Sequence, residues 1–350
     1  MRKILLTTTA LVALGGVSAA SALEISGFQR FTYHSWDDTL DNETDGGNDT
    51  TMSDENRIVL SHSVTGDSGL TASGYYRIDD MAESYRDITV SGDFGAVSLG
   101  NYTTPGGFMY NSHIYNGTFK DNNHQSFSGV GTPKWGAYAA LADSLGLNTI
   151  NYTLPEMGGF TVMVSHSDGG YKSESAYVAD STGTAPTAAV AGGGADVNEY
   201  GIAYAGGLGE MSFRVHGIQA KADDSTGTAG DEKENQEFGI NLGSGPFEAR
   251  FTTASQETNG TDGVATADIE INEYSVTYKA SDDLTLGIIT QSRKDGLDTT
   301  NNPKLDETIF GANYFIMPGL RVQASYVDFD YEGATNNSGS QTNIALRIDY

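Results

Sequence analysis

The stretch "GPFEARFTTAS", residues 245–255, alternates apolar and polar side chains along its length. Phe247 and Phe251 fall on one face of an extended strand. Glu248 and Arg250 fall on the other, because successive side chains of a strand point to opposite sides. The stretch therefore predicts a β-strand with one apolar and one polar face.

The same period of two continues along the chain after Leu23. It is clear in "GEMSFRVHGIQ" from Gly209 and in "GLRVQASY" from Gly319. No later segment reaches the roughly 20 consecutive apolar residues that a membrane-spanning helix requires. A helical membrane protein is therefore excluded, and a soluble β-protein or a β-barrel remains.

The strands are joined alternately by short links and longer polar loops. The short links lie at 66–69, 92–95, 155–159, 206–209, 243–245, 281–283 and 317–319. The loops lie at 37–54, 79–83, 103–146, 168–196, 222–234, 258–268, 294–304 and 332–339. Seven links and eight loops make fifteen connections and predict sixteen strands.

An even number of antiparallel strands with tight turns at one end and long loops at the other is typical of outer-membrane barrels. A soluble β-sandwich has similar strands but seldom separates its loop lengths so regularly. We therefore predict an all-β fold, a 16-stranded antiparallel transmembrane β-barrel with short periplasmic turns and long external loops.

Both ends of the chain fit this prediction. Arg2 and Lys3, an apolar run and Ala20-Ser21-Ala22 form a secretory signal peptide over residues 1–22, which leaves 23–350 as one barrel domain. The last strand, "TNIALRIDY", ends in Tyr350. Barrels inserted by the outer-membrane assembly machinery usually end in such a strand, most often with Phe, so we expect that machinery to be a partner.

Charge and cysteine content exclude other classes. The chain has 19 Lys and Arg against 46 Asp and Glu, and removal of Arg2 and Lys3 leaves 17 cations and a net charge of −29. Nucleic-acid binding requires a positive surface and is excluded. Cysteine is absent, so neither disulfides nor cysteine-bound metal stabilises the fold.

Two strands break the alternation. The apolar phase of "SYVDFDY" moves from Tyr326 to Val327, and that of "IEINEYSVTY" slips between Ile271 and Tyr274. A β-bulge or the end of the membrane-embedded portion would explain each shift.

Four segments carry a resemblance to a known family: "ISGFQRFTYHS" after the signal peptide, "TGDSGLTASGYY", "VSGDFGAVSLGN" and the terminal "LRIDY". The chain resembles the general diffusion porins, in particular the trimeric 16-stranded porins of alphaproteobacterial type. The resemblance implies a homotrimer in the Gram-negative outer membrane. It also implies a water-filled channel through which small hydrophilic solutes and ions diffuse passively.

In that family the third external loop folds into the lumen and narrows the pore. The resemblance assigns this role to the loop 103–146, the longest of the chain, whose aromatic residues could pack it against the wall. The acids that would face the wall are Asp121 and Asp143, with Lys120 beside the first. Asp121 is the expected partner, because it lies in the middle of the loop.

Family pores set wall arginines against the carboxylates of this loop. Strand phase assigns seven arginines to the lumen, and an arginine facing lipid would cost about 2 to 4 kcal/mol at mid-membrane. Arg30, Arg57 and Arg77 are the expected constriction wall, since they lie on the first three strands. The other lumen-facing residues are Arg214, Arg250, Arg321 and Arg347.

Catalytic and metal sites are not expected. The six histidines are scattered without a metal-ligand spacing. Gly66-Asp67-Ser68-Gly69 has the letters of a serine-protease motif, yet Asp, Ser and Gly are also what a tight turn requires. The alternatives to a porin are an outer-membrane lipid hydrolase, which would use Ser68, and a non-conducting adhesin or structural barrel.

Acidic residues crowd the first and fifth external loops. Such carboxylates suit Ca²⁺ or Mg²⁺, and these ions would bridge the loops to lipopolysaccharide phosphates. The residues concerned are Asp37, Asp38, Asp41, Glu43, Asp45, Asp49, Asp54, Glu55, Asp223, Asp224, Asp231, Glu232 and Glu234.

Overall fold

The computed structural model describes residues 23–38, 50–80, 82–101, 103–106, 149–167, 196–223, 232–259, 265–295, 304–332 and 337–350. Within these ranges the chain forms sixteen β-strands. They are β1 (Glu24–Asp38), β2 (Thr50–Thr65), β3 (Thr71–Asp79), β4 (Ala82–Gly92), β5 (Gly95–Gly100), β6 (Thr149–Thr153), β7 (Phe160–Ser167), β8 (Val197–Leu208), β9 (Met211–Asp223), β10 (Glu232–Ser244), β11 (Phe247–Asn259), β12 (Ala265–Lys279), β13 (Leu284–Asp295), β14 (Lys304–Met317), β15 (Leu320–Glu332) and β16 (Asn337–Asp349).

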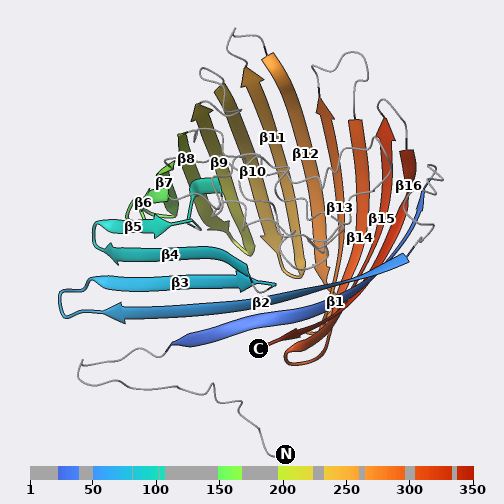
Figure 1. Cartoon of the computed structure of the whole chain (residues 1–350), viewed down its shortest axis with the longest axis horizontal. Helices are drawn as coiled ribbons and strands as arrows, with labels where there is room; N and C mark the ends of the chain where they lie inside the picture. The colour runs from blue at the N-terminus through green and yellow to red at the C-terminus, as the bar shows by residue number, and fades with distance from the viewer. Residues whose placement is uncertain are drawn as a thin grey trace, which may run out of the picture.

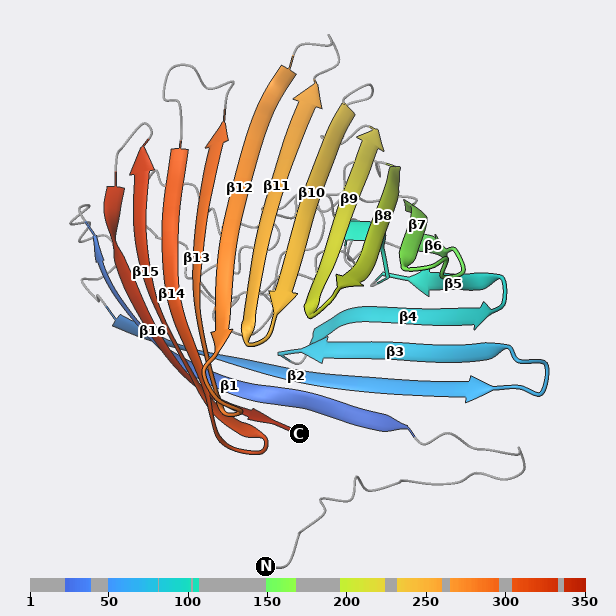
Figure 2. The ribbon, with the colours of Figure 1, turned by 180° about the vertical axis from the view of Figure 1, so that it is seen from behind.

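The strands form one closed barrel. Each strand pairs antiparallel with its neighbours in sequence, and β1 pairs with β16 to close the ring. Figures 1 and 2 show the strands side by side around the wall, with the C-terminus beside the β14–β15 turn. Closure leaves no unpaired edge, as a β-protein in lipid requires. The predicted 16-stranded barrel is confirmed.

Where β1 meets β16, the seam depends on a glycine. Gly27 and Tyr350 exchange two backbone hydrogen bonds of 3.0 and 3.1 Å, and the Tyr350 hydroxyl donates to the Arg57 carbonyl oxygen at 3.0 Å. A Cβ added at Gly27 would overlap that carbonyl oxygen. The hydroxyl bond gives a physical reason for Tyr rather than Phe at the end of the chain.

Each of the seven predicted short links falls at a connection of two to six residues between consecutive strands. The link that contains Ser68 is closed by Gly69 N–H donating to the Gly66 carbonyl at 3.0 Å, and Gly69 has the positive φ of 79° that glycine accepts readily. One predicted loop is shorter than expected, because only Asp80 and Met81 separate β3 from β4. Asp80 bonds this connection to β2 by accepting the Asn56 N–H at 2.7 Å.

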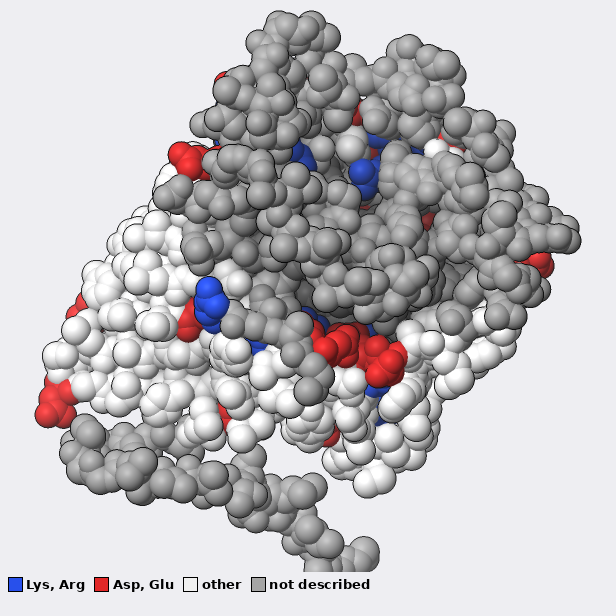
Figure 3. All heavy atoms as spheres, viewed as in Figure 1, with Lys and Arg blue, Asp and Glu red and all other residues white. Residues whose placement is uncertain are grey.

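Alternation divides the wall into an outer apolar face and an inner polar face. On β1, Phe31 points outward and is 56% exposed, whereas its neighbour Arg30 points inward and is 3% exposed. Figure 3 shows broad uncharged areas on the flanks of the wall. Outward aromatic rings pair near the turns, as Phe247 and Tyr278 do at 4.8 Å, and such rings belong at a membrane interface.

The two phase shifts are not bulges. Pairing runs without interruption through Ile271 on β12 and Val327 on β15. Both side chains are fully buried on the inner face, and Val327 contacts Ile289 and Ile309 there. The outward positions on this loop side become polar, as at Asp328, which is what the end of the apolar band predicts.

In the part of the chain that the structure describes, no helix is long and apolar enough to cross a membrane.

Candidate pore-lining site

Five arginines lie next to one another on the inner wall. Arg321 of β15, Arg347 of β16 and Arg30 of β1 stand directly opposite one another in the strand register. Arg57 of β2 and Arg77 of β3 continue the row on the next two strands. The structure thus brings all three expected wall residues together and adds Arg321 and Arg347 to them.

Three carboxylates of the wall each join two of these arginines. Glu55 contacts Arg30 and lies 3.1 Å from the Arg57 guanidinium. Asp79 lies 2.7 Å from Arg57 and 2.6 Å from Arg77.

At the other end of the row, Asp349 lies 3.2 Å from Arg321 and 2.7 Å from Arg347. We call these five arginines and three carboxylates the arginine ladder. Five guanidiniums against three carboxylates leave two positive charges in excess. An arginine fork suits carboxylate oxygens geometrically, so the shared pairs fix the positions of the guanidiniums along the wall.

Aromatic rings lie beneath the ladder. The guanidinium carbons of Arg347, Arg57 and Arg30 lie 3.7, 4.8 and 5.7 Å from the centre of the Phe28 ring. Arg77 lies 4.8 Å from the Tyr85 ring on β4. These distances lie within the range of cation–π attraction.

The other two arginines predicted to face the lumen lie elsewhere on the wall. Arg214 of β9 and Arg250 of β11 flank Asn241 of β10 in the register. Arg250 pairs with Glu248 at 2.5 Å. In the sixteen-strand ring these strands are far from β1, so the two arginines form a separate group.

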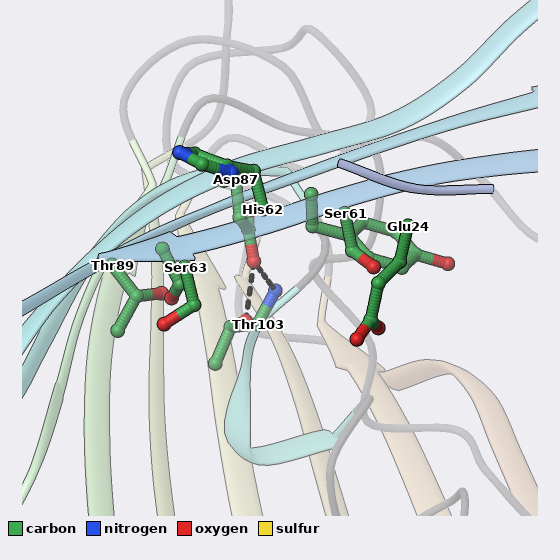
Figure 4. A pocket seen from close by; sticks show the side chains of 10 residues that line it. Glu24, Ser61, His62, Ser63, Asp87, Thr89 and Thr103 are labelled. Atoms are coloured by element: carbon green, nitrogen blue, oxygen red, sulfur yellow. Dashed lines mark hydrogen bonds between the residues drawn. The ribbon is translucent and has the colours of Figure 1, made fainter. Parts of the chain in front are cut away.

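The root of the third long loop is bonded to the inner wall. The Thr103 N–H donates to the Asp87 carboxylate at 2.7 Å, and the Thr103 hydroxyl donates to the same group (Figure 4). Further on, the Gly106 N–H donates to the buried Glu199 carboxylate of β8 at 3.1 Å. Because Glu199 lies on the inner face, the loop enters the barrel at its root, as predicted. Lys120, Asp121 and Asp143 lie outside the described residues.

A recess of about 430 Å³ lies beside this root. Its lining includes the carboxylates of Glu24 and Asp87 (Figure 4). The hydroxyl-bearing residues are Ser61, Ser63, Ser73, Tyr75, Thr89 and Thr103. The recess therefore offers hydrogen-bonding groups beside the root of the loop.

Two carboxylates of the ladder lie on strands, contrary to the sequence-based prediction. The sequence predicts Glu55 among the acidic residues of the first loop and Asp79 as the first residue of the next one. The structure puts both on strands, with Glu55 buried on the inner face of β2. The strand begins earlier than the local acidity indicates, and the parity of Glu55 with Arg57 was the signal that could have revealed it.

Two histidines of the inner wall hydrogen-bond neighbouring side chains. The His34 ring hydrogen-bonds Asn343 at 2.7 Å and Ser53 at 2.8 Å. His216 lies 3.0 Å from Glu237. Among the described residues, no group of three or more His, Cys, Asp or Glu side chains is arranged to hold a metal ion.

Comparison with known proteins places the chain in a family. The family model described as "Gram-negative porin" matches residues 7–336. A search of the curated proteins found no match.

Solved structures share the fold. The anion-selective porin from Comamonas acidovorans superposes with a TM-score of 0.65 at 13% identity, over 94% of this chain and 100% of that one. The trimer form of OmpT from Vibrio cholerae gives 0.63 at 16% identity, over 95% and 100%. A mutant of the Rh. blastica porin gives 0.55 at 16% identity, over 94% and 100%.

The family match spans nearly the whole chain, and the barrel it predicts is the barrel that the structure has. The chain belongs to the Gram-negative porin family and is an outer-membrane channel.

Proposed function

We propose that this porin is a passive general-diffusion pore that carries out no chemical step. Small hydrophilic solutes and ions would cross down their gradients, limited by pore width and wall charge. The observation that carries the proposal is the closed sixteen-stranded barrel with a charged inner face. Barrels of this strand number are wide enough to leave an aqueous channel.

Vesicle swelling tests this proposal. Folded protein in liposomes should admit neutral sugars at a rate that falls as the sugar grows, because exclusion by width is the only selection that acts on them. Vesicles with inserted protein that swell no faster than empty vesicles would overturn it.

We infer that the arginine ladder is the wall of the constriction, with Arg30, Arg57 and Arg77 nearest the third loop. The position of the ladder beside the root of the third loop supports this inference. The ladder ends at Tyr85 of β4, and Asp87 of the same strand binds the root of that loop. Asp121, with Lys120 and Asp143, would face the ladder from the loop.

Replacement of Arg77 by alanine tests this role. In a salt gradient, Arg77→Ala should shift the reversal potential toward cation preference, because a positive charge leaves the narrowest section. Arg86→Ala is the matched control, since Arg86 is an exposed cation on the outer face of the next strand. An equal shift in both variants, or none in Arg77→Ala, would contradict the assignment.

We further propose that the protein is a homotrimer, as the Vibrio OmpT form is. Polar side chains interrupt the apolar outer face on β1 and β2. Gln29 stands opposite Asn56 in the register, and Asn56 donates to Asp54 at 3.2 Å. Exposed Phe31 and Ile58 flank them. Amide groups in lipid lose their hydrogen bonds to water, so contact with neighbouring subunits suits this face better.

Spin labels test the trimer, since the chain contains no cysteine. Label at Gln29→Cys should give one short inter-spin distance, because this face would surround the threefold axis. Label at Ile288→Cys, on the outer face of β13 away from β1, should give a longer one. Absence of dipolar coupling at position 29 in purified protein would exclude the trimer.

We infer that Ser68 has no catalytic role, because it lies on an exposed turn closed by backbone hydrogen bonds. A lipid or ester substrate should show no hydrolysis above the empty-vesicle rate. Hydrolysis by the wild type that Ser68→Ala abolishes would establish the enzyme alternative.

The remaining partner proposals rest on sequence. Residues 1–22 would be cleaved during export, which an N-terminus at Leu23 in the mature protein would test. Tyr350 and its strand would contact the assembly machinery. The acidic external loops would bind lipopolysaccharide through Ca²⁺ or Mg²⁺, so chelation should reduce lipopolysaccharide copurification.

A further inference from the structure

Phe28 is an aromatic side chain on the polar face of the wall. It shares the inner face of β1 with Arg30, Thr32 and His34, all of which are polar and buried. Its own exposure is only 5%. A bare aromatic ring on a water-filled lumen would expose hydrophobic surface, so neighbouring groups must cover Phe28.

Three guanidiniums from three strands gather around this ring. Arg347 of β16 approaches its centre to 3.7 Å, Arg57 of β2 to 4.8 Å, and Arg30 of β1 itself to 5.7 Å. Phe28 stands opposite both Arg57 and Asp349 in the register. The ring therefore lies at the centre of the arginine ladder.

Two neighbouring arginines repel Arg347. Its strand partners are Arg321 on one side and Arg30 on the other, and like charges directly opposite on adjacent strands repel. Asp349 attracts Arg347 at 2.7 Å but is shared with Arg321. The negative face of the Phe28 ring supplies a further attraction that leaves no net charge in the channel.

We propose that Phe28 positions the arginine ladder and thereby sets the ion selectivity of the pore. The ring holds Arg347 and Arg57 against the wall, so their charges lie at one level and do not extend across the lumen. Phe28 is a positioning residue, because it acts through the arginines. The inference rests on the proposed function of the ladder as the constriction wall.

The experiment measures reversal potential and single-channel conductance for Phe28→Leu, Phe28→Met and Phe28→Tyr in planar bilayers. Leu and Met keep apolar volume without a ring, whereas Tyr keeps the ring. Both ring-free variants should change the cation-to-anion permeability ratio by about twofold or more, and Phe28→Tyr should retain the wild-type ratio. No ladder charge is removed in any of them.

Phe238→Leu is the matched control, since Phe238 is exposed on the outer face of β10, far from β1 in the ring. Its permeability ratio should equal that of the wild type. Heat-modified mobility on gels selects folded protein, and Phe28→Met gives a second ring-free variant if Phe28→Leu does not fold.

The proposal is overturned if a folded ring-free variant keeps the wild-type ratio, or if Phe28→Tyr or Phe238→Leu changes it as much. Failure of the proposed function itself would give other results. The wild type would not conduct, or Arg77→Ala would leave the reversal potential unchanged.

Discussion

Asp349 contacts two arginines, Arg321 and Arg347, and so decides how much positive charge this end of the ladder presents. Strand phase was sufficient to place the arginines on the inner face. It also places Asp349 beside Arg347 on the same strand, whereas the contact with Arg321 depends on the β15–β16 register, which the sequence of neither strand states.

Replacement of Asp349 by asparagine should make the channel more selective for anions, because Arg321 and Arg347 lose their shared negative partner while the side-chain volume is kept. Reversal potentials in a salt gradient measure the change. Asp328→Asn, on the outer face of β15, removes the same charge away from the ladder and should shift the potential by less.

A shift toward cations in Asp349→Asn would contradict the assigned sign. Equal shifts in Asp349→Asn and Asp328→Asn would show that overall charge, and not the ladder, sets selectivity.

At the scale of elements, barrel closure depends on close contact between β1, β2 and the chain terminus. Gly27 lies against the Arg57 carbonyl and bonds Tyr350 through its backbone. A side chain at this position must push β1 away from β2 or displace the terminal tyrosine.

We expect Gly27→Ala to lower the temperature at which the folded barrel loses its gel mobility, at a cost of about 1 to 3 kcal/mol, as for other overpacked positions. Gly74→Ala on β3 is the matched control. No atom lies within 4 Å of an added Cβ there, so its effect should be near zero. Similar losses in both variants would show that strand flexibility, not the contact at the seam, is responsible.

The elements themselves were largely predictable. Tight turns such as 66–69 were predicted because Gly, Asp and Ser favour them, and all seven were found. At Asp80 the polar flanking residues predict a longer loop, but they are the ends of β3 and β4. The sequence could not show whether the phase shift at Ile271 is a bulge. Apolar residues that face inward beyond the apolar band change the alternation in the same way as a bulge.

At the scale of the whole molecule, the arginine ladder is a local cluster of positive charge in an acidic chain, whose inner wall also carries carboxylates such as Asp87 and Glu199. The chain carries a formal net charge of −27, yet the arginine ladder holds an excess of positive charge on the inner wall. Exposed acids would concentrate cations near the mouth, whereas the ladder would favour anions at the narrowest section. On this proposal, ion selectivity reflects the balance between the field of the exposed acids and the field of the ladder. Salt that screens the exposed acids should increase the influence of the ladder.

The most direct test of the account is the current through single wild-type proteins in a planar bilayer. A water-filled pore predicts discrete conductance steps that rise with salt concentration, and a trimer predicts closure in three equal steps. Protein that inserts as a folded barrel but passes no current at any salt concentration would contradict the central claim.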